Sequence, residues 1–348
     1  MKIAVALSGG VDSSVSLYLL KKMGYNLFAL FMRNWEEEEG PCVSEEDAED
    51  ARRVCELLDI PFYPINFTKD YWDNVFSHFL KEIEAGHTPN PDILCNREIK
   101  FKALFEKAKS LGADALATGH YCQTKNGELY KGNDPGKDQS YFLYTVKSPI
   151  LKETFFPVGH LEKPEVRKIA ERENLPVFNK KDSTGICFIG KRQFKPFLER
   201  YLPHEEGVIE TVEGKVVGKH DGIHYYTIGQ RKGLGIGGRG DAYFVARKDK
   251  ENRKVIVAQG ENHPALFAKT LTATDISWVG EAPALPMKCK AKIRYRQVEQ
   301  PCTVEVLGEK LLVRFDAPQR AITPRQSVVF YDGERCLGGA MIEEALPE

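Results

Sequence analysis

Apolar residues along the first ~200 positions fall into two patterns that alternate with each other. Short continuous apolar runs, which are typical of buried strands, occur at 3–7, 27–32, 62–65 and 113–118. Segments with apolar residues at helical spacing lie between and after these runs, at about 11–23, 45–58, 69–85, 92–111 and 164–173. Strands that alternate with helices predict an α/β fold in which a mostly parallel sheet has helices on both faces.

The pattern changes at the end of a helical segment expected over 192–201, which Pro203 follows. Short strands with glycine-rich turns are then expected at 207–212, 215–218, 225–228, 242–247 and 255–258. A second all-β block begins near Lys269. We therefore expect an α/β domain over 1–203, a central β domain over 204–268 and a C-terminal β-barrel domain over 269–348.

Composition narrows the class of protein. The chain has 348 residues, 42% of them hydrophobic, and no stretch approaches the ~18 apolar residues of a membrane span. We also find no secretion signal, so the eight cysteines are expected as free thiols in a reducing, cytoplasmic compartment. They include no C-x2-C pair, and no metal-ligating residues are predicted.

The formal net charge of −1 conceals an uneven distribution of charge. Residues 36–50 contain nine acidic residues and no basic one, so the rest of the chain carries −1 − (−9) = +8. We expect the acidic segment to be a solvated loop running into a helix. The basic remainder is compatible with a nucleic-acid partner.

The loop after the first apolar run reads Ser-Gly-Gly-Val-Asp-Ser-Ser over residues 8–14 and precedes a helical pattern. Side chains this small let backbone N–H groups close on an anion, and the helix dipole favours negative charge at that point. No Gly-Lys-Ser/Thr follows, so the loop is not a Walker A motif. The sequence predicts a phosphate-binding loop of another kind, and the alternative is an ordinary glycine-rich turn.

Residues 233–238 match the dinucleotide-binding pattern G-x-G-x-x-G. The match lies between β-like segments and no helical pattern follows it, so the geometry that binds a dinucleotide is absent. We expect a glycine-rich loop of a β module.

A second candidate for chemistry lies at 88–102, where Asn90 is a good N-cap and Pro91 a good first helical residue. Asp92 and Cys95 are then three positions apart on one helix face, with Cβ atoms about 5–6 Å apart. The helix N-terminus favours a thiolate, and a carboxylate beside it can take a proton. A capped helix with a buried cysteine is the alternative.

A third candidate is Cys187, in Ser-Thr-Gly-Ile-Cys-Phe-Ile-Gly. Together with Cys95 it suggests a two-thiol reaction.

Five cations alternate with other residues over 288–296, namely Lys288, Lys290, Lys292, Arg294 and Arg296. At the period of a strand they share one face, with a spacing of about 6.6–6.8 Å that suits a phosphate backbone. A solvated barrel face is the alternative. Residues 163–203, with ten Lys/Arg against five Asp/Glu, form a second basic segment.

Six motifs occur in order along the chain: SGGVDSS, NPDILCNREIKF, ATGHY, KDQSYFL, STGICFIG and TIGQRKGLGIGG. Together they resemble the bacterial tRNA-specific 2-thiouridylases, the MnmA family of PP-loop ATP pyrophosphatases. The resemblance spans the chain and is strongest over 1–240. It implies an adenine nucleotide alpha-hydrolase-like (PP-loop) domain followed by two small barrel-like β domains. The implied activity is that of a tRNA-uridine 2-sulfurtransferase: the C2 oxygen of the wobble uridine is adenylated, sulfur replaces it, and AMP and pyrophosphate are released.

The resemblance also implies roles for individual residues. The implied ATP-binding residues are Ala6, Leu7, Ser8, Gly9, Gly10, Val11, Asp12, Ser13, Met32 and Gly119. The implied tRNA-binding residues are Asn90, Pro91, Asp92, His120, Lys137, Asp138, Gln139, Arg294, Tyr295 and Gln326. Asp92 would act as acid or base at the uridine, and Cys187 would carry a persulfide. Cys95 would be its partner thiol, either freeing sulfide or closing a Cys95–Cys187 disulfide. The strand period places Arg294 and Tyr295 on opposite faces, so joint contact with tRNA requires a bulge or the end of the strand.

The cofactors and partners that the resemblance implies are ATP with Mg²⁺, a sulfur donor and tRNA. The donor would be a cysteine desulfurase or a sulfur-relay protein, and the tRNAs would be Glu, Gln and Lys isoacceptors. An iron–sulfur cluster on Asp92, Cys95 and Cys187 is a further option, although one carboxylate and two thiols make an incomplete ligand set.

Two other classes of function fit part of the sequence. An amide- or amidine-forming ligase of the same fold would act on a small molecule and would leave Cys95, Cys187 and the basic strand without a role. It would release AMP without tRNA or a sulfur donor. A non-enzymatic RNA-binding protein with a vestigial nucleotide loop would not bind ATP.

Overall fold

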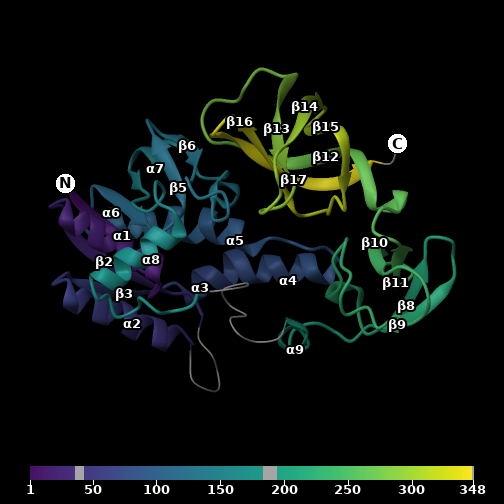
Figure 1. Cartoon of the computed structure of the whole chain (residues 1–348), viewed down its shortest axis with the longest axis horizontal. Helices are drawn as coiled ribbons and strands as arrows, with labels where there is room; N and C mark the ends of the chain where they lie inside the picture. The colour runs from purple at the N-terminus through teal and green to yellow at the C-terminus, as the bar shows by residue number, and fades with distance from the viewer. Residues whose placement is uncertain (36–42, 183–193, 347–348) are drawn as a thin grey trace.

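A computed structural model of the protein describes residues 1–35, 43–182 and 194–346. Figure 1 shows an N-terminal α/β unit in purple to teal and a C-terminal β-barrel in yellow-green. A smaller green β unit, carrying β8 to β11, lies below the barrel. No helix among the described residues is long and apolar enough to cross a membrane.

The N-terminal unit is built on a five-stranded parallel sheet in the order β3-β2-β1-β4-β7. Its strands are β1 (Lys2–Ala6), β2 (Asn26–Arg33), β3 (Phe62–Asn66), β4 (Ala115–Thr118) and β7 (Thr154–Phe155). The four apolar runs of the sequence correspond to the first four of these strands. The predicted parallel sheet is therefore confirmed.

Both faces of this sheet are covered by helices, as the continuous apolar runs predict. On one face, Ile3 and Val5 pack in a cluster with residues of α1 (Val11–Lys22), α2 (Val43–Leu57) and α8 (Lys163–Arg172). On the other face, Ala4 and Ala6 pack with residues of two longer helical segments. Those segments are α3 (Thr68–Tyr71), η1 (Trp72–Phe76) and α4 (Ser77–Glu84), then α5 (Pro91–Leu94), η2 (Cys95–Leu104) and α6 (Phe105–Ser110).

The hairpin of β5 (Cys122–Lys125) and β6 (Glu128–Lys131) follows the fourth sheet strand and was not predicted from the sequence. It pairs with the C-terminal barrel, where Leu129 lies opposite Cys336 and Tyr130 opposite Arg335. The α/β unit and the barrel are therefore joined by backbone hydrogen bonds. Between the hairpin and α8 lie only η3 (Ser140–Phe142), α7 (Ser148–Lys152) and β7.

The C-terminal unit is a closed six-stranded barrel. Its strands are β12 (Phe267–Trp278), β13 (Met287–Lys292), β14 (Gln300–Leu307), β15 (Lys310–Arg320), β16 (Ser327–Asp332) and β17 (Arg335–Leu346). They follow the order β12-β15-β14-β13-β16-β17, and β17 pairs back to β12. Val304, Val313 and Phe330 are among the apolar side chains that fill the interior. The predicted second β block is confirmed as a barrel.

The central unit is a four-stranded sheet in the order β10-β11-β8-β9, in which β8 runs parallel to β11. Its elements are β8 (Gly207–Thr211), β9 (Val216–His220), η4 (Ile223–Tyr225), β10 (Tyr243–Asp249), β11 (Lys254–Gln259) and η5 (Pro264–Leu266). The strand expected at 225–228 was wrong. The N–H groups of Tyr225 and Tyr226 bond back to Gly222 and Ile223, which makes a turn instead of a ladder.

The helix expected over 192–201 ends three residues earlier than predicted. In the structure α9 covers Phe194–Leu198, and the N–H of Tyr201 bonds to the carbonyl of Leu198 in a tighter turn. Residues 192 and 193 lie outside the described part of the chain.

Candidate functional site

The candidate site lies at the carboxyl edge of the parallel sheet, between β1 and β4. The chain runs outward from β1 to β2 and β3 on one side and places β4 on the other. Such a change of direction leaves a crevice in which α/β proteins bind ligands. Ala6 pairs with Thr118, so the loop after β1 and the dipeptide Gly119-His120 leave the sheet at the same level.

Two glycines allow the backbones at this crevice to approach each other. A Cβ on Gly119 would lie 2.7 Å from the backbone nitrogen of Ser13, and one on Gly9 would lie 2.2 Å from the carbonyl oxygen of Asp47. Gly9 also has a φ of +75°, which favours glycine. Gly10 is the N-cap of α1 and has no side chain that could cap the helix. The backbone N–H groups of the first turn are therefore available to bind an anion.

Asp12, in the first turn of α1, is held by two side chains from later in the chain. Lys163 Nζ donates to both carboxylate oxygens at 2.7 and 2.8 Å, and the Tyr121 hydroxyl donates to Oδ1 at 2.7 Å. Lys163 is only 7% exposed. Burial and the neighbouring Asp12 raise the pKa of Tyr121, so it remains a hydrogen-bond donor.

Asp182 joins the same cluster and binds three cations. Its carboxylate accepts from Lys137 at 2.7 Å, from Lys163 at 2.8 Å and from Arg167 at 2.6 Å. Burial alone would raise the pKa of Asp182, but the hydrogen bonds from Lys137 and Lys163 outweigh it and hold the pKa at about 2. The carboxylate therefore stays charged at neutral pH.

Lys163 and Lys180 are functional candidates that sequence reasoning missed. The loop motif has no lysine of its own, yet Lys163 reaches Asp12 across 151 residues. Lys180 donates to the carbonyl of Gly9 at 3.0 Å and pairs with Asp47 and Asp50 of α2. The excess of cations over 163–203 is the sequence signal that points to them.

The helix that carries Asp92 and Cys95 begins as predicted. The Asn90 side chain accepts a hydrogen bond from the Asp92 N–H at 3.1 Å, and Pro91 is the first helical residue. Cys95 is 5% exposed and belongs to the same apolar cluster as Ala6, against which Met32 also packs. Burial raises the pKa of Asp92, and the nearby Lys100 partly opposes that rise. Candidate residues of the nucleotide loop and of this helix therefore border one cluster.

Cys187 lies outside the described residues, as do positions 36–42 of the acidic segment. The proximity of Cys95 and Cys187 stays a prediction. No disulfide joins two of the cysteines in the described parts of the chain. No group of three or more His, Cys, Asp or Glu within those parts could hold a metal ion.

The candidate tRNA residues of the α/β unit lie close to the nucleotide loop but make internal contacts. Asp138 is 5% exposed and accepts from the backbone of Gly132 and from Ser140 and Lys292. The Gln139 side chain accepts from the Tyr121 N–H at 2.9 Å. His120 is buried, which lowers its pKa well below the usual value, so the ring is neutral.

The candidate tRNA residues of the barrel lie where the barrel meets the other units. The Tyr295 hydroxyl donates to the carbonyl of Lys137 at 3.2 Å, and the Gln326 side chain donates to the carbonyl of Thr88 at 2.5 Å. Arg294 donates to the carbonyls of Arg320 and Ala321 at 3.0 and 2.6 Å. The structure thus brings Tyr295 beside Lys137 and Gln326 beside the Asn90 segment.

The expected row of five cations on one strand face was wrong. β13 ends at Lys292, and Arg294 lies in the turn beyond it. Lys292 is 9% exposed, because it pairs with Asp138 at 3.2 Å and lies over the Tyr331 ring. Only Lys288 and Lys290 form an exposed pair on the strand. Arg294 and Tyr295 lie beyond the end of β13. The alternation of a strand therefore does not force their side chains onto opposite faces.

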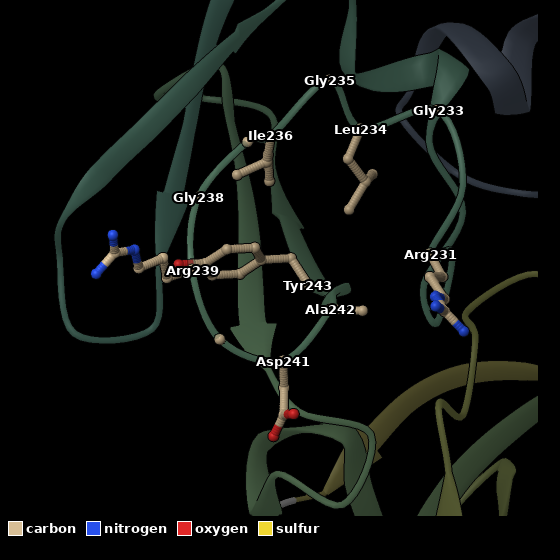
Figure 2. A pocket seen from close by; sticks show the side chains of 12 residues that line it. Arg231, Gly233, Leu234, Gly235, Ile236, Gly238, Arg239, Asp241, Ala242 and Tyr243 are labelled. Carbon is tan, nitrogen blue, oxygen red and sulfur yellow. The ribbon is translucent and has the colours of Figure 1, made fainter.

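The glycine-rich loop of 233–238 lines a cavity of about 300 Å³ in the central unit. Figure 2 shows the loop curving round this cavity, with Arg231 and Arg239 on opposite sides. The loop runs into the strand β10 and not into a helix, which confirms that the dinucleotide geometry is absent. The residues that line this cavity, between 231 and 243, are not those that form the crevice between β1 and β4.

Three family models match consecutive parts of the chain. They are the tRNA methyl transferase HUP domain over 1–191, the tRNA methyl transferase PRC-barrel domain over 195–259 and the aminomethyltransferase beta-barrel domain over 268–342. The parallel sheet, its phosphate loop and the first of these models define a PP-loop protein with two β domains.

Relatives that match nearly the whole chain identify the family to which it belongs. The tRNA-specific 2-thiouridylase MnmA of Protochlamydia amoebophila is 55% identical over 99% of this chain and 94% of its own length. The MnmA of Francisella philomiragia is 55% identical over 98% of this chain and 99% of its own length. The chain belongs to the MnmA family of tRNA-specific 2-thiouridylases.

Solved structures are more distant. The U34-tRNA thiolase NcsA from Methanococcus maripaludis, solved with its [4Fe-4S] cluster, is 22% identical. It covers 54% of this chain and 61% of its own, with a TM-score of 0.38. A 4-thiouridine synthetase in complex with RNA and ATP is 19% identical over 57% of this chain and 49% of its own, also with a TM-score of 0.38.

Proposed function

We propose that this protein uses ATP to place sulfur at C2 of the wobble uridine, position 34, of tRNA. One observation carries the proposal. Cys95 and Ala6, the last residue of β1, belong to a single apolar cluster on one face of the parallel sheet. A nucleotide-activated base and a thiol can therefore share one site. Family membership supports the same reaction.

ATP would bind with its phosphates at the loop of residues 8–13 and the N-terminus of α1, where backbone N–H groups and the helix dipole favour anions. Met32 and Gly119 would line the adenosine side. The Asp12 carboxylate, whose side chain is 32% exposed, is a suitable ligand for Mg²⁺, which proteins bind through one or two carboxylates beside phosphates. When bound, Mg²⁺ neutralises phosphate charge. Lys163 keeps Asp12 in place.

The target base would be unstacked from the anticodon loop and held by Asn90, Pro91 and Asp92. The C2 carbonyl oxygen is a poor leaving group, and its adenylation turns it into part of AMP. Burial raises the pKa of Asp92, so this carboxyl holds a proton more readily than an exposed one does. That shift suits a group that donates and accepts a proton beside the uridine.

Sulfur transfer would use both cysteines. The terminal sulfur of a Cys187 persulfide attacks C2 and AMP departs with the former C2 oxygen. Cys95 then attacks the inner sulfur of Cys187, which closes a disulfide and frees the 2-thiouridine. Alternatively, Cys95 attacks first and frees sulfide for the attack on C2. In both routes a thiol reductant restores the cysteines, and a persulfide donor reloads Cys187.

The contacts of Asp182 support the proposal that Cys187 can act at the nucleotide loop. Asp182 is tied to Lys163, which in turn binds Asp12 of the nucleotide loop. Cys187 follows Asp182 by five residues, and five residues span at most about 17 Å. This position of Asp182 supports the proposal that Cys187 acts beside the nucleotide loop.

The remaining roles are part of the same proposal. His120, Lys137, Asp138, Gln139, Arg294, Tyr295 and Gln326 would contact tRNA, either directly or after their internal contacts open. Glu, Gln and Lys isoacceptors are the proposed substrates, and a cysteine desulfurase or a relay protein is the proposed donor. We place the reaction in the cytoplasm, where tRNA and reduced thiols occur together. The proposed domain boundaries are 1–203, 204–268 and 269–348.

The test is mass spectrometry of nucleosides from unmodified tRNA incubated with protein, ATP, Mg²⁺ and a sulfur source. We expect 2-thiouridine only when all components are present. Cys187→Ser is expected to abolish sulfur transfer while tRNA adenylation remains detectable. Equal thiolation by the variant would remove Cys187 from the mechanism, and AMP release without tRNA would favour a small-molecule ligase.

Peptide mapping of the oxidised enzyme should recover a Cys95–Cys187 disulfide after turnover. A second disulfide can form in the same sample, because the Sγ atoms of Cys289 and Cys302 lie 3.7 Å apart on neighbouring strands. Cys289→Ser therefore serves as the background for this experiment.

A further inference from the structure

The segment that leads into the Asn90 helix is contacted by both β units. From the barrel, Arg325 pairs with Glu82 at 3.1 Å and Gln326 donates to the carbonyl of Thr88 at 2.5 Å. From strand β10 of the central unit and the turn after it, Lys250 donates to the carbonyl of Glu84 at 2.6 Å, and Lys248 approaches the Thr88 hydroxyl at 3.4 Å. Thr88 therefore meets both β units, one through its backbone and the other through its side chain.

Lys248 differs from the other cations of this contact. Its ammonium donates to the carbonyl of Tyr226 at 2.8 Å and to the Thr88 hydroxyl at 3.4 Å. Among the described residues no carboxylate forms an ion pair with it, and burial lowers its pKa to about 8. Removing an amine from water without an anion is unfavourable, so simple attachment of the two units does not account for it. Lys250, exposed just beyond the same strand, already provides attachment.

The contact between Lys248 and Thr88 matters because Thr88 lies close to the helix that carries Asp92. Thr88 stands two residues before Asn90, whose side chain caps the helix by accepting from the Asp92 N–H. A shift of the Thr88 backbone would be passed directly to the cap and to Asp92. In enzymes, a displacement of about 1 Å at a reacting group costs on the order of 100-fold in rate.

We propose that Lys248 is a positioning residue, which holds the Thr88 hydroxyl and so fixes the entry of the segment that presents Asn90 and Asp92 to the target uridine. This inference rests on the proposed function. It assigns the central β unit a part in the reaction, through a residue outside the catalytic domain.

A double-mutant cycle tests the pair. Lys248→Met removes the ammonium and keeps most of the side-chain length, and Thr88→Val removes the hydroxyl and keeps the shape. We expect each change to lower kcat for 2-thiouridine formation by about tenfold or more, with the affinity for ATP unchanged within about twofold. The double variant should be no worse than either single one, because the two residues act through one contact. Multiplication of the two losses would overturn the proposal.

Two further variants separate positioning from folding. Lys250→Met removes the neighbouring lysine and should keep kcat near the wild-type value. Thr88→Ser keeps the hydroxyl and should restore most of the activity that Thr88→Val loses. If Lys248→Met fails to fold, the comparison of Thr88→Val with Thr88→Ser still tests the proposal. Failure of Thr88→Ser to restore activity would contradict a role for the hydroxyl.

Hydrogen exchange provides a readout that does not depend on activity. In Lys248→Met, but not in Lys250→Met, the amides of residues 92–95 should exchange about tenfold faster or more. Unchanged exchange would overturn the positioning role even in an active enzyme. A wild-type protein that makes no 2-thiouridine would instead contradict the proposed function, while the exchange result would still show whether Lys248 orders this segment.

Discussion

Asp92 illustrates a conflict between stability and activity within one side chain. Burial raises its pKa in the folded protein above the usual value of 3.8. Folding therefore favours the protonated form, and at neutral pH the ionised carboxylate is a cost to the folded state. A residue retained at such a cost is a good candidate for proton transfer.

Asp92→Asn should therefore raise the melting temperature at pH 7, and the gain should shrink as the pH falls toward 3.8, where the wild-type carboxyl becomes protonated. The same variant should lose about 100-fold or more in the rate of thiolation if Asp92 transfers a proton. Thermal unfolding at several pH values and the nucleoside assay measure the two effects. Glu106→Gln, on an exposed carboxylate of α6, is the control. A lower melting temperature at pH 7 would contradict the burial argument.

At the scale of elements, the candidate site depends on how closely two loops approach. The loop after β1 and the dipeptide after β4 meet backbone to backbone, with Gly119 against Ser13. Backbone atoms cannot move aside as a flexible side chain can. The geometry of the phosphate loop is therefore set from the neighbouring strand as well as from its own sequence.

Gly119→Ala should push these loops apart, because the new Cβ would lie 2.7 Å from the Ser13 nitrogen. We expect the affinity for ATP to fall by about tenfold or more, measured as the ATP concentration needed for half-maximal AMP release. Gly280→Ala is a matched control, since nothing lies within 4 Å of its added Cβ. Unchanged ATP affinity in Gly119→Ala would place the nucleotide elsewhere.

At the scale of the whole molecule, three units converge on one segment of the catalytic domain. The barrel is joined to the α/β unit by the pairing of β17 with β6, and both β units contact residues 82–88. In Figure 1 the barrel lies above α4, and the central unit lies to the right of this helix. The proposed function requires an RNA that contacts the barrel while one of its bases lies at the crevice.

Lys288 and Lys290 are the exposed cations of β13, and their reversal tests this arrangement. The double change to Glu should weaken tRNA binding and reduce the slope of log affinity against log salt by about one for each phosphate that the strand no longer neutralises. Lys292 is excluded from the test because it is buried against Asp138. Reversal of Lys22 and Lys107, on α1 and α6, makes the same change in net charge. An equal effect of both pairs would mean that β13 has no specific contact with tRNA.

The sequence predicted features whose causes are local. The parallel strands, the turn from β1 into α1 and the Asn90 cap each follow from neighbouring residues. It could not predict contacts between distant positions, such as Lys163 with Asp12 or the hairpin with β17, because no local pattern marks their partners. The row of cations failed for a related reason: alternation reveals a strand but not where the strand ends.

The cluster around Asp12 and Asp182 opposes three cations, Lys137, Lys163 and Arg167, with two carboxylates. These cations are already paired with carboxylates, so an anion at this crevice binds through the backbone N–H groups at the N-terminus of α1 and gains little from the cations. Inorganic phosphate should consequently compete poorly here, although it resembles part of the nucleotide. A cell rich in phosphate would leave such a pocket open for ATP.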